Sequence, residues 1–146
     1  MNQAARPVKY RKVATDKSTF ASRAMPMSGL ILLAFLVFHL VHFTLGGGPM
    51  SDNFNHVDSF GRHDVYKMVV LGFTKPMVSA AYIVAMLLLS SHLSHGVTSL
   101  FQSLGLNNPK YKGMIKSAGP AVAVLVLVGT CSIPVACLAG WVKVAS

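Results

Sequence analysis

Acidic residues are scarce in this chain, which has four Asp and no Glu among its 146 residues. Charged residues make up 12% of the sequence, about half of the ~25% that is usual in a soluble domain. So few ionised groups cannot supply an ordinary solvated surface. The mean hydropathy of +0.54 agrees. The composition therefore argues against a soluble globular domain.

Asp, Glu, Lys and Arg are absent from three long apolar runs. These runs are Gly29–Leu45, Met77–Phe101 and Ala118–Val142. Crossing the hydrocarbon core of a bilayer takes roughly 20 residues in a helix, so each run is long enough. Buried helices of a soluble protein are the alternative, which three charge-free runs in so short a chain disfavour.

The predicted fold is an all-α integral membrane protein in which three transmembrane helices form part of a haem-binding bundle. The chain is expected to be a single membrane domain, with a basic N-terminal segment over 1–27. The predicted spans cover about 28–46, 76–101 and 118–142, an outer loop covers 47–75, and a cytoplasmic loop covers 102–117. Within the outer loop, residues 64–73 are expected to form a short interfacial helix.

Basic residues are distributed unevenly between the two sides of this topology. Nine of the thirteen Lys and Arg residues precede the first span or lie in the 102–117 loop. The positive-inside rule places these segments in the cytoplasm and the C-terminus outside the cell membrane. Basic residues that flank spans in the lipid bilayer also explain the net charge of +9 more simply than nucleic-acid binding does.

Cysteine is nearly absent, and both thiols, Cys131 and Cys137, lie in the third span. Six residues apart, they do not share a helical face, so neither a disulfide nor a metal pair is predicted. The spans also lack any carboxylate that could carry ions, which ranks a small transporter or channel last among the functions.

Four histidines do occur inside the spans. His39 and His42 lie in the motif FHLVHF of the first span, and His92 and His95 lie in SHLSHG of the second. Ionisable groups at membrane depth are costly, which makes them candidates for a functional site. Each pair has i, i+3 spacing, so its members lie near one helical face.

Neutral imidazole offers one lone pair to a metal and one N–H to a hydrogen-bond acceptor. Haem iron takes two axial ligands of this kind, and facing helices of a bundle can present them. The alternative is that each histidine only hydrogen-bonds to a neighbouring helix. Measured from the predicted cytoplasmic ends of their spans, His39 lies at about 20 Å and His92 at about 14 Å. This difference favours two haems at different depths, each needing a second ligand from elsewhere.

Three stretches resemble the di-haem cytochrome b membrane-anchor subunit of bacterial succinate dehydrogenase and fumarate reductase. They are ASRAMPMSGLILLAFLVFHLVHFTLG, FTKPMVSAAYIVAMLLLSSHLSHGVTSLFQSLGLNNPKY and the third span. The family anchor usually has five spans, and this chain resembles the last three. The resemblance implies partners, namely a flavoprotein subunit that oxidises succinate and an iron–sulfur subunit that relays its electrons. It also implies that haem b and a quinone receive those electrons in the anchor, and the quinone is expected to be menaquinone.

The resemblance also implies roles for the four histidines. Two family ligands fall on His39 and His92, each as an axial ligand of a separate haem iron, whereas His42 and His95 match positions that are not ligands. They are expected to contact propionates, protons or quinone. The first two family spans and their ligands are absent, which implies a split subunit with a partner segment or a truncated product. The expected function is thus a quinone-reducing or non-catalytic subunit of succinate:quinone oxidoreductase, and the alternative is a haem-free structural anchor.

Overall fold

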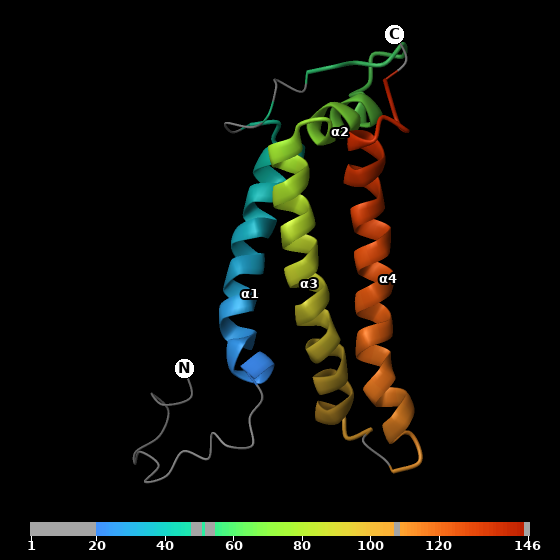
Figure 1. The fold of residues 1–146 in the computed structure, drawn as a ribbon. Coiled ribbons are helices and arrows are strands. Elements are labelled where there is room, and N and C mark those ends of the chain that lie inside the picture. Colours follow the sequence, from blue (N-terminus) through green and yellow to red (C-terminus); the bar gives the residue numbers. More distant parts are fainter. Residues whose placement is uncertain (1–19, 48–50, 52–54, 107–108, 145–146) are drawn as a thin grey trace, which may run out of the picture.

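The computed structural model describes residues 20–47, 51, 55–106 and 109–144, and these form an all-helical structure (Figure 1). Within them the only strand-like feature is an isolated bridge between Val57 and His63. The helices are α1 (Phe20–His39), its π-helical continuation η1 (Leu40–Thr44), α2 (Val65–Phe73), α3 (Pro76–Ser103) and α4 (Lys112–Leu138). Three helical segments are long and apolar enough to cross a membrane. The predicted all-α membrane fold is thereby confirmed, while the basic residues before Phe20 lie outside the described part.

Local sequence explains where the middle helices begin. The side chain of Asp64 caps α2 by accepting a hydrogen bond from the backbone N–H of Lys67 at 2.9 Å, which satisfies one of the free amides of the first turn. Pro76 then opens α3, where its missing N–H costs nothing and its φ angle suits the helix. The predicted short helix over 64–73 is therefore confirmed, and Figure 1 shows it lying across one end of the long helices.

The third long helix differs from its predicted span at both ends. It begins at Lys112, six residues before the predicted start at 118, and ends at Leu138 rather than at 142. Hydropathy locates the hydrocarbon core, whereas the helix extends through the interface and carries Lys112 and Lys116 on its first turns. At the other end Gly140 adopts a φ of +70°, the left-handed conformation that terminates helices and favours glycine.

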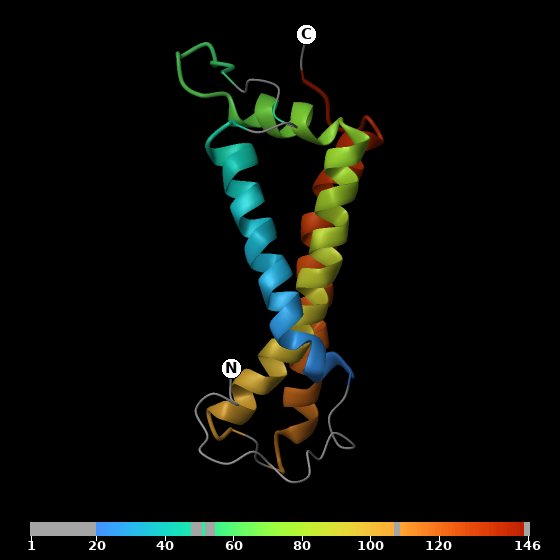
Figure 2. The ribbon, with the colours of Figure 1, turned by 90° about the vertical axis from the view of Figure 1, so that its left-hand side faces the viewer.

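The long helices form a bundle that is open on one side. α3 packs most extensively against α4, and α1 makes its main contact with α3. Seen from the side, α1 lies close to α3 at the lower end and diverges toward α2 (Figure 2). α2 lies across the wide end and contacts both α3 and α4.

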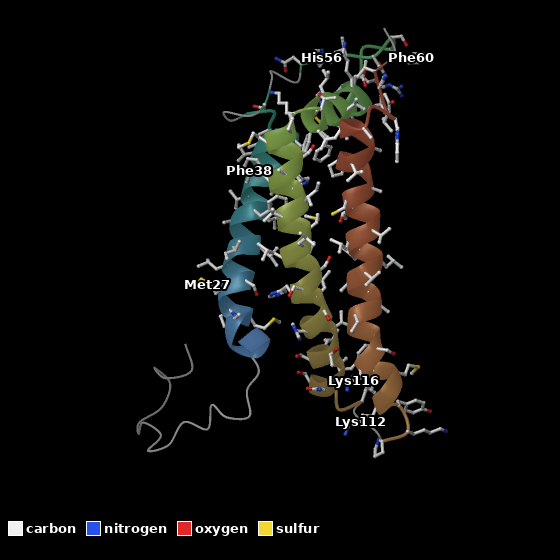
Figure 3. All side chains as sticks on the ribbon, in the orientation of Figure 1. Met27, Phe38, His56, Phe60, Lys112 and Lys116 are labelled. Atoms are coloured by element: carbon white, nitrogen blue, oxygen red, sulfur yellow. The ribbon has the colours of Figure 1, made fainter. Side chains whose placement is uncertain are left out.

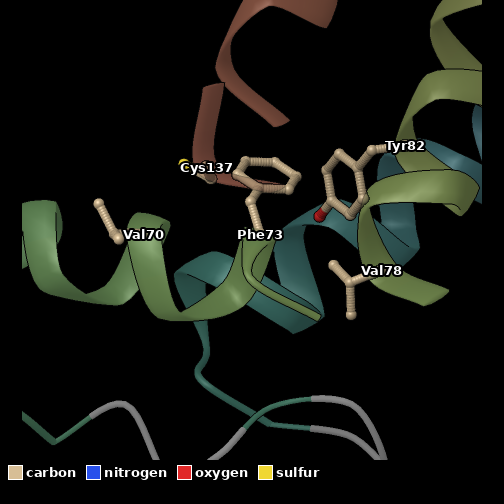
Figure 4. Packing of buried hydrophobic residues seen from close by; sticks show 5 residues of the cluster. All are labelled: Val70, Phe73, Val78, Tyr82 and Cys137. Atoms are coloured by element: carbon tan, nitrogen blue, oxygen red, sulfur yellow. The ribbon is translucent and has the colours of Figure 1, made fainter. Parts of the chain in front are cut away.

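The buried core is small and lies at the α2 end. Its members are Val70, Phe73, Val78, Tyr82 and Cys137, drawn from α2, α3 and α4 (Figure 4). The Ser79 hydroxyl donates to the Phe73 carbonyl at 2.7 Å and fixes the corner between α2 and α3. Large apolar side chains elsewhere point outward, such as Leu125 at 74% exposure. Such a surface suits lipid, because hydrocarbon does not penalise exposed apolar groups.

Candidate functional site

Tyr82 of α3 links the two histidines of the first span. Its hydroxyl lies 3.3 Å from Nδ1 of His39 and 3.2 Å from Nδ1 of His42. The tyrosine is 5% exposed and His42 is 1% exposed. The π-helical turn begins directly after His39, and turns of this kind are frequent at functional sites. Both imidazoles thus face α3, which agrees with the shared face predicted from their spacing.

A phenol hydroxyl carries one proton, so it donates to one imidazole and accepts from the other. If Nδ1–H of His39 donates to Tyr82, the tyrosine donates to Nδ1 of His42. Nε2 of His39 then keeps a lone pair that can bind a metal. In the reverse arrangement Nε2 of His39 carries the proton and cannot bind one. A single tyrosine can therefore prepare one of these two histidines as a ligand, and the choice depends on which ring reaches a ligand cavity.

The cavity that meets this requirement has a volume of about 860 Å³ and lies among all four helices. His39 and Tyr82 line it, whereas His42 does not. The rest of its wall is almost entirely apolar, and includes Leu36, Phe43 and Met86. Cofactor sites commonly have this size and character, with a few polar groups in an apolar wall. Of the two imidazoles, that of His39 therefore borders the cavity and that of His42 does not.

Aromatic rings hold the Tyr82 hydroxyl in place. Phe35 and Phe73 pack edge-on against its ring, each with centroids 5.1 Å apart. Phe38 stacks on His42 at 5.4 Å with an angle of 8° between the ring planes. Such contacts add about 0.5–1.5 kcal/mol per aromatic pair beyond the burial of area. The hydroxyl is thus carried on a rigid, well-packed ring.

His92 occupies a separate site near the other end of α1. Its Nδ1 lies 2.9 Å from the hydroxyl of Ser28, and that hydroxyl donates to the carbonyl of Met25 at 3.0 Å. With its own proton engaged, Ser28 accepts from Nδ1–H of His92. This tautomer leaves the Nε2 lone pair of His92 available to a metal. Gly29 lies beside the ring, and an added Cβ there would be 3.5 Å from its Cε1, in ordinary contact.

The two sites lie at different depths. Tyr82 marks the level of His39, and His92 follows ten residues later in α3, which corresponds to about 15 Å along the helix axis. The difference of about 6 Å expected from the sequence was too small, because it took the predicted cytoplasmic ends of the two spans to lie at one height. In the structure Ser28 faces His92 instead. One metal ion cannot bind both histidines at this separation.

The remaining histidines lie apart from both sites. His95 is exposed and lines a smaller cavity between α3 and α4, so the shared spacing of His92 and His95 does not give them shared partners. His56 and His63 belong to the loop before α2. Within the described residues no three His, Cys, Asp or Glu side chains cluster as a metal site. His39 and His92 therefore lie in two separate places, each with its own hydrogen-bonding partner on the other helix.

Sequence reasoning did not identify Tyr82 or Ser28 as partners of the histidines. No local pattern marks either partner, because each depends on how α1 and α3 are aligned. Both cysteines are free thiols, and Cys137 packs into the core.

Comparison with known proteins adds no relative, since no family model, no curated protein and no solved structure matches this chain.

Proposed function

We propose that this chain is part of a haem-binding membrane anchor of the succinate:quinone oxidoreductase type. The observation that carries the proposal is His39 in the wall of an apolar cavity of about 860 Å³, with Tyr82 holding its Nδ1. His92, oriented by Ser28, offers a second ligand about 15 Å away along the bundle. The resemblance in the FHLVHF and SHLSHG stretches supports the same reading.

The donor set would suit two haems, with one histidine of this chain for each. His39 and His92 would each present Nε2 to iron, and Tyr82 and Ser28 would keep the rings in the required tautomer and orientation. Haem b, when bound, supplies a one-electron carrier between the soluble subunits and a quinone. The apolar side chains around His39 would limit the access of water to its Nε2. His42 remains a hydrogen-bond partner of Tyr82. His95 lies away from His39 and His92.

The second ligand of each haem belongs, in this proposal, to helices outside the described residues. A partner segment with two spans and one histidine in each would complete both sites. The flavoprotein and iron–sulfur subunits would dock on the cytoplasmic side, and menaquinone is the proposed electron acceptor.

Difference spectra test the ligand assignment. In membranes that contain the assembled complex, we expect a reduced-minus-oxidised b-type haem signal with two components. His39→Ala should abolish one component and His92→Ala the other, while His56→Ala in the outer loop serves as the control and leaves both. A spectrum that is unchanged in both span variants contradicts the assignment.

A haem-free structural anchor is the competing function. It is favoured by one observation, which is that Tyr82 already gives both His39 and His42 a hydrogen-bond partner without any metal. Its signature is co-purification with flavoprotein and iron–sulfur subunits in the absence of haem absorbance. The same preparation therefore distinguishes the two functions.

A further inference from the structure

A second cavity, of about 390 Å³, lies at the end of the bundle opposite α2. Polar side chains from more than two turns of α3 line it, together with one lysine of α4. These are Ser94, His95, Thr98, Ser99, Gln102 and Lys116. Figure 3 shows Lys116 and Lys112 at this end of α4. Neither His39 nor His92 lines this cavity.

Most of these polar side chains make no hydrogen bond to the residues that the structure describes. The Thr98 hydroxyl donates to the Ser94 carbonyl at 3.1 Å. The side chains of His95, Ser99 and Gln102 make no hydrogen bond to any residue that the structure describes. Polar groups on membrane helices are usually satisfied by neighbouring helices or by a bound molecule. His95, Ser99 and Gln102 are exposed, so their donors are available to a ligand with acceptor oxygens.

The charge of the cavity selects the sign of that ligand. Lys116 contributes a cation, and no carboxylate among the described residues pairs with it. Asp58 and Asp64, the acidic residues of the described part, both lie in the loop at the opposite end. An ammonium group together with hydroxyl and amide donors is suited to a phosphate.

The depth of the cavity matches the headgroup layer of a bilayer. α3 has 28 residues and is about 42 Å long, close to the 40–45 Å thickness that includes both headgroup layers. Lys116 lies four residues from the start of α4, or about 6 Å along the axis, within a headgroup layer. His95 lies eight residues from the end of α3, or about 12 Å, below that layer. Met25 and Pro120 supply apolar wall beside the polar groups.

We propose that this cavity binds the phosphate headgroup of an anionic phospholipid. Lys116 neutralises the phosphate, Ser99 and Gln102 donate hydrogen bonds to its oxygens, and His95 contacts the glycerol region just below. The acyl chains leave along the apolar wall into the surrounding lipid. This inference stands on the cavity alone and does not depend on haem binding at His39 or His92.

Native mass spectrometry of the full-length chain tests the proposal. The purified protein in dodecyl maltoside is titrated with dioleoyl phosphatidylglycerol at 0.15 M salt, and bound lipids are counted. We expect one tightly bound lipid per chain. Lys116→Gln should weaken binding at least about fivefold, the effect of one lysine contact at an anionic headgroup. Ser99→Ala combined with Gln102→Ala should also weaken it without changing the charge.

Lys112 provides the matched control. It lies one turn before Lys116 on α4 and does not line the cavity, so Lys112→Gln should change the affinity by less than about twofold at this salt concentration. Equal affinity of Lys116→Gln and the unaltered protein overturns the proposal, as does an equal loss in both lysine variants. Displacement of the lipid by millimolar inorganic phosphate overturns the lipid assignment, since a free anion then suffices.

Discussion

Gly119 of α4 packs directly on the backbone carbonyl of Ser94 in α3. A Cβ added to Gly119 would lie far inside van der Waals distance of the Ser94 oxygen and also of the Thr98 hydroxyl. The two longest helices cross at this point, and α3 packs more extensively against α4 than against any other helix. Close approach of backbones at small residues is the usual way in which membrane helices associate.

Gly119→Ala should therefore separate α3 from α4. Because the Ser94 obstacle is backbone, it cannot rotate away, and we expect a loss of about 1–3 kcal/mol in the free energy of unfolding, as for an overpacked core. The measurement is the unfolding of the purified chain in mixed micelles with increasing dodecyl sulfate.

Gly129 is the control in the same helix. A Cβ there meets nothing within 4 Å, so Gly129→Ala should be neutral or stabilising by up to about 1 kcal/mol, the difference in helix propensity. Similar losses at both positions would show that the Gly119 contact does not determine the packing.

The loop between the first two spans contains a pH-sensitive turn. The backbone N–H of Arg62 is the largest influence that holds the pKa of the Asp58 carboxyl below its ordinary value, and the Arg62 guanidinium and the Phe60 N–H act in the same direction. The carboxyl pKa is lower in the folded turn than in the unfolded chain, where it is about 3.9. The ionised carboxylate therefore stabilises the folded turn at pH values above about 3.9. That contribution is lost as the pH falls through the folded pKa.

We expect the ¹³C resonance of the Asp58 carboxyl to titrate below pH 3.9, with Arg62→Ala moving the midpoint toward it. The backbone amide of Arg62 remains in that variant, so the shift should be partial. A midpoint that is the same in both proteins contradicts the role assigned to the guanidinium.

Physical constraints that act along one helix could be predicted from the sequence, and the alignment between helices could not. Absence of charge from the three runs predicts spans because hydrocarbon excludes charged groups. The i, i+3 spacing likewise places His39 and His42 on one face. The pairing of Tyr82 with them depends instead on the position of α1 along the axis of α3. That position is determined by contacts such as His92 with Ser28. The error in the depth estimate has the same origin.

Tyr82→Phe tests the shared hydroxyl. The ring remains and keeps its contacts with Phe35 and Phe73, but Nδ1 of His39 and of His42 both lose this partner. We expect a decrease of about 1–3 kcal/mol in the free energy of unfolding. On the proposed function, the spectral component assigned to His39 should also shift, while that of His92 does not.

Tyr66→Phe is the matched control for the loss of a phenol hydroxyl. Its hydroxyl donates to the Lys143 carbonyl at 2.9 Å from an exposed position, so the free energy of unfolding should change by no more than about 0.5 kcal/mol. If Tyr82→Phe is as mild as this control, the bridge between the histidines does not stabilise the bundle.

Ser28→Ala addresses the second site in the same manner. The hydroxyl of Ser28 accepts from Nδ1–H of His92 while donating to the Met25 carbonyl, so its removal releases the ring from the tautomer that frees Nε2. On the proposed function, we expect the low-spin haem signal in electron paramagnetic resonance to change for the His92 component alone. Ser117→Ala removes an exposed hydroxyl bonded only to the Met114 carbonyl of its own helix and should alter neither component. A change in the His39 component instead of the His92 component would mean that Ser28 acts on the bundle as a whole and does not orient this one ligand.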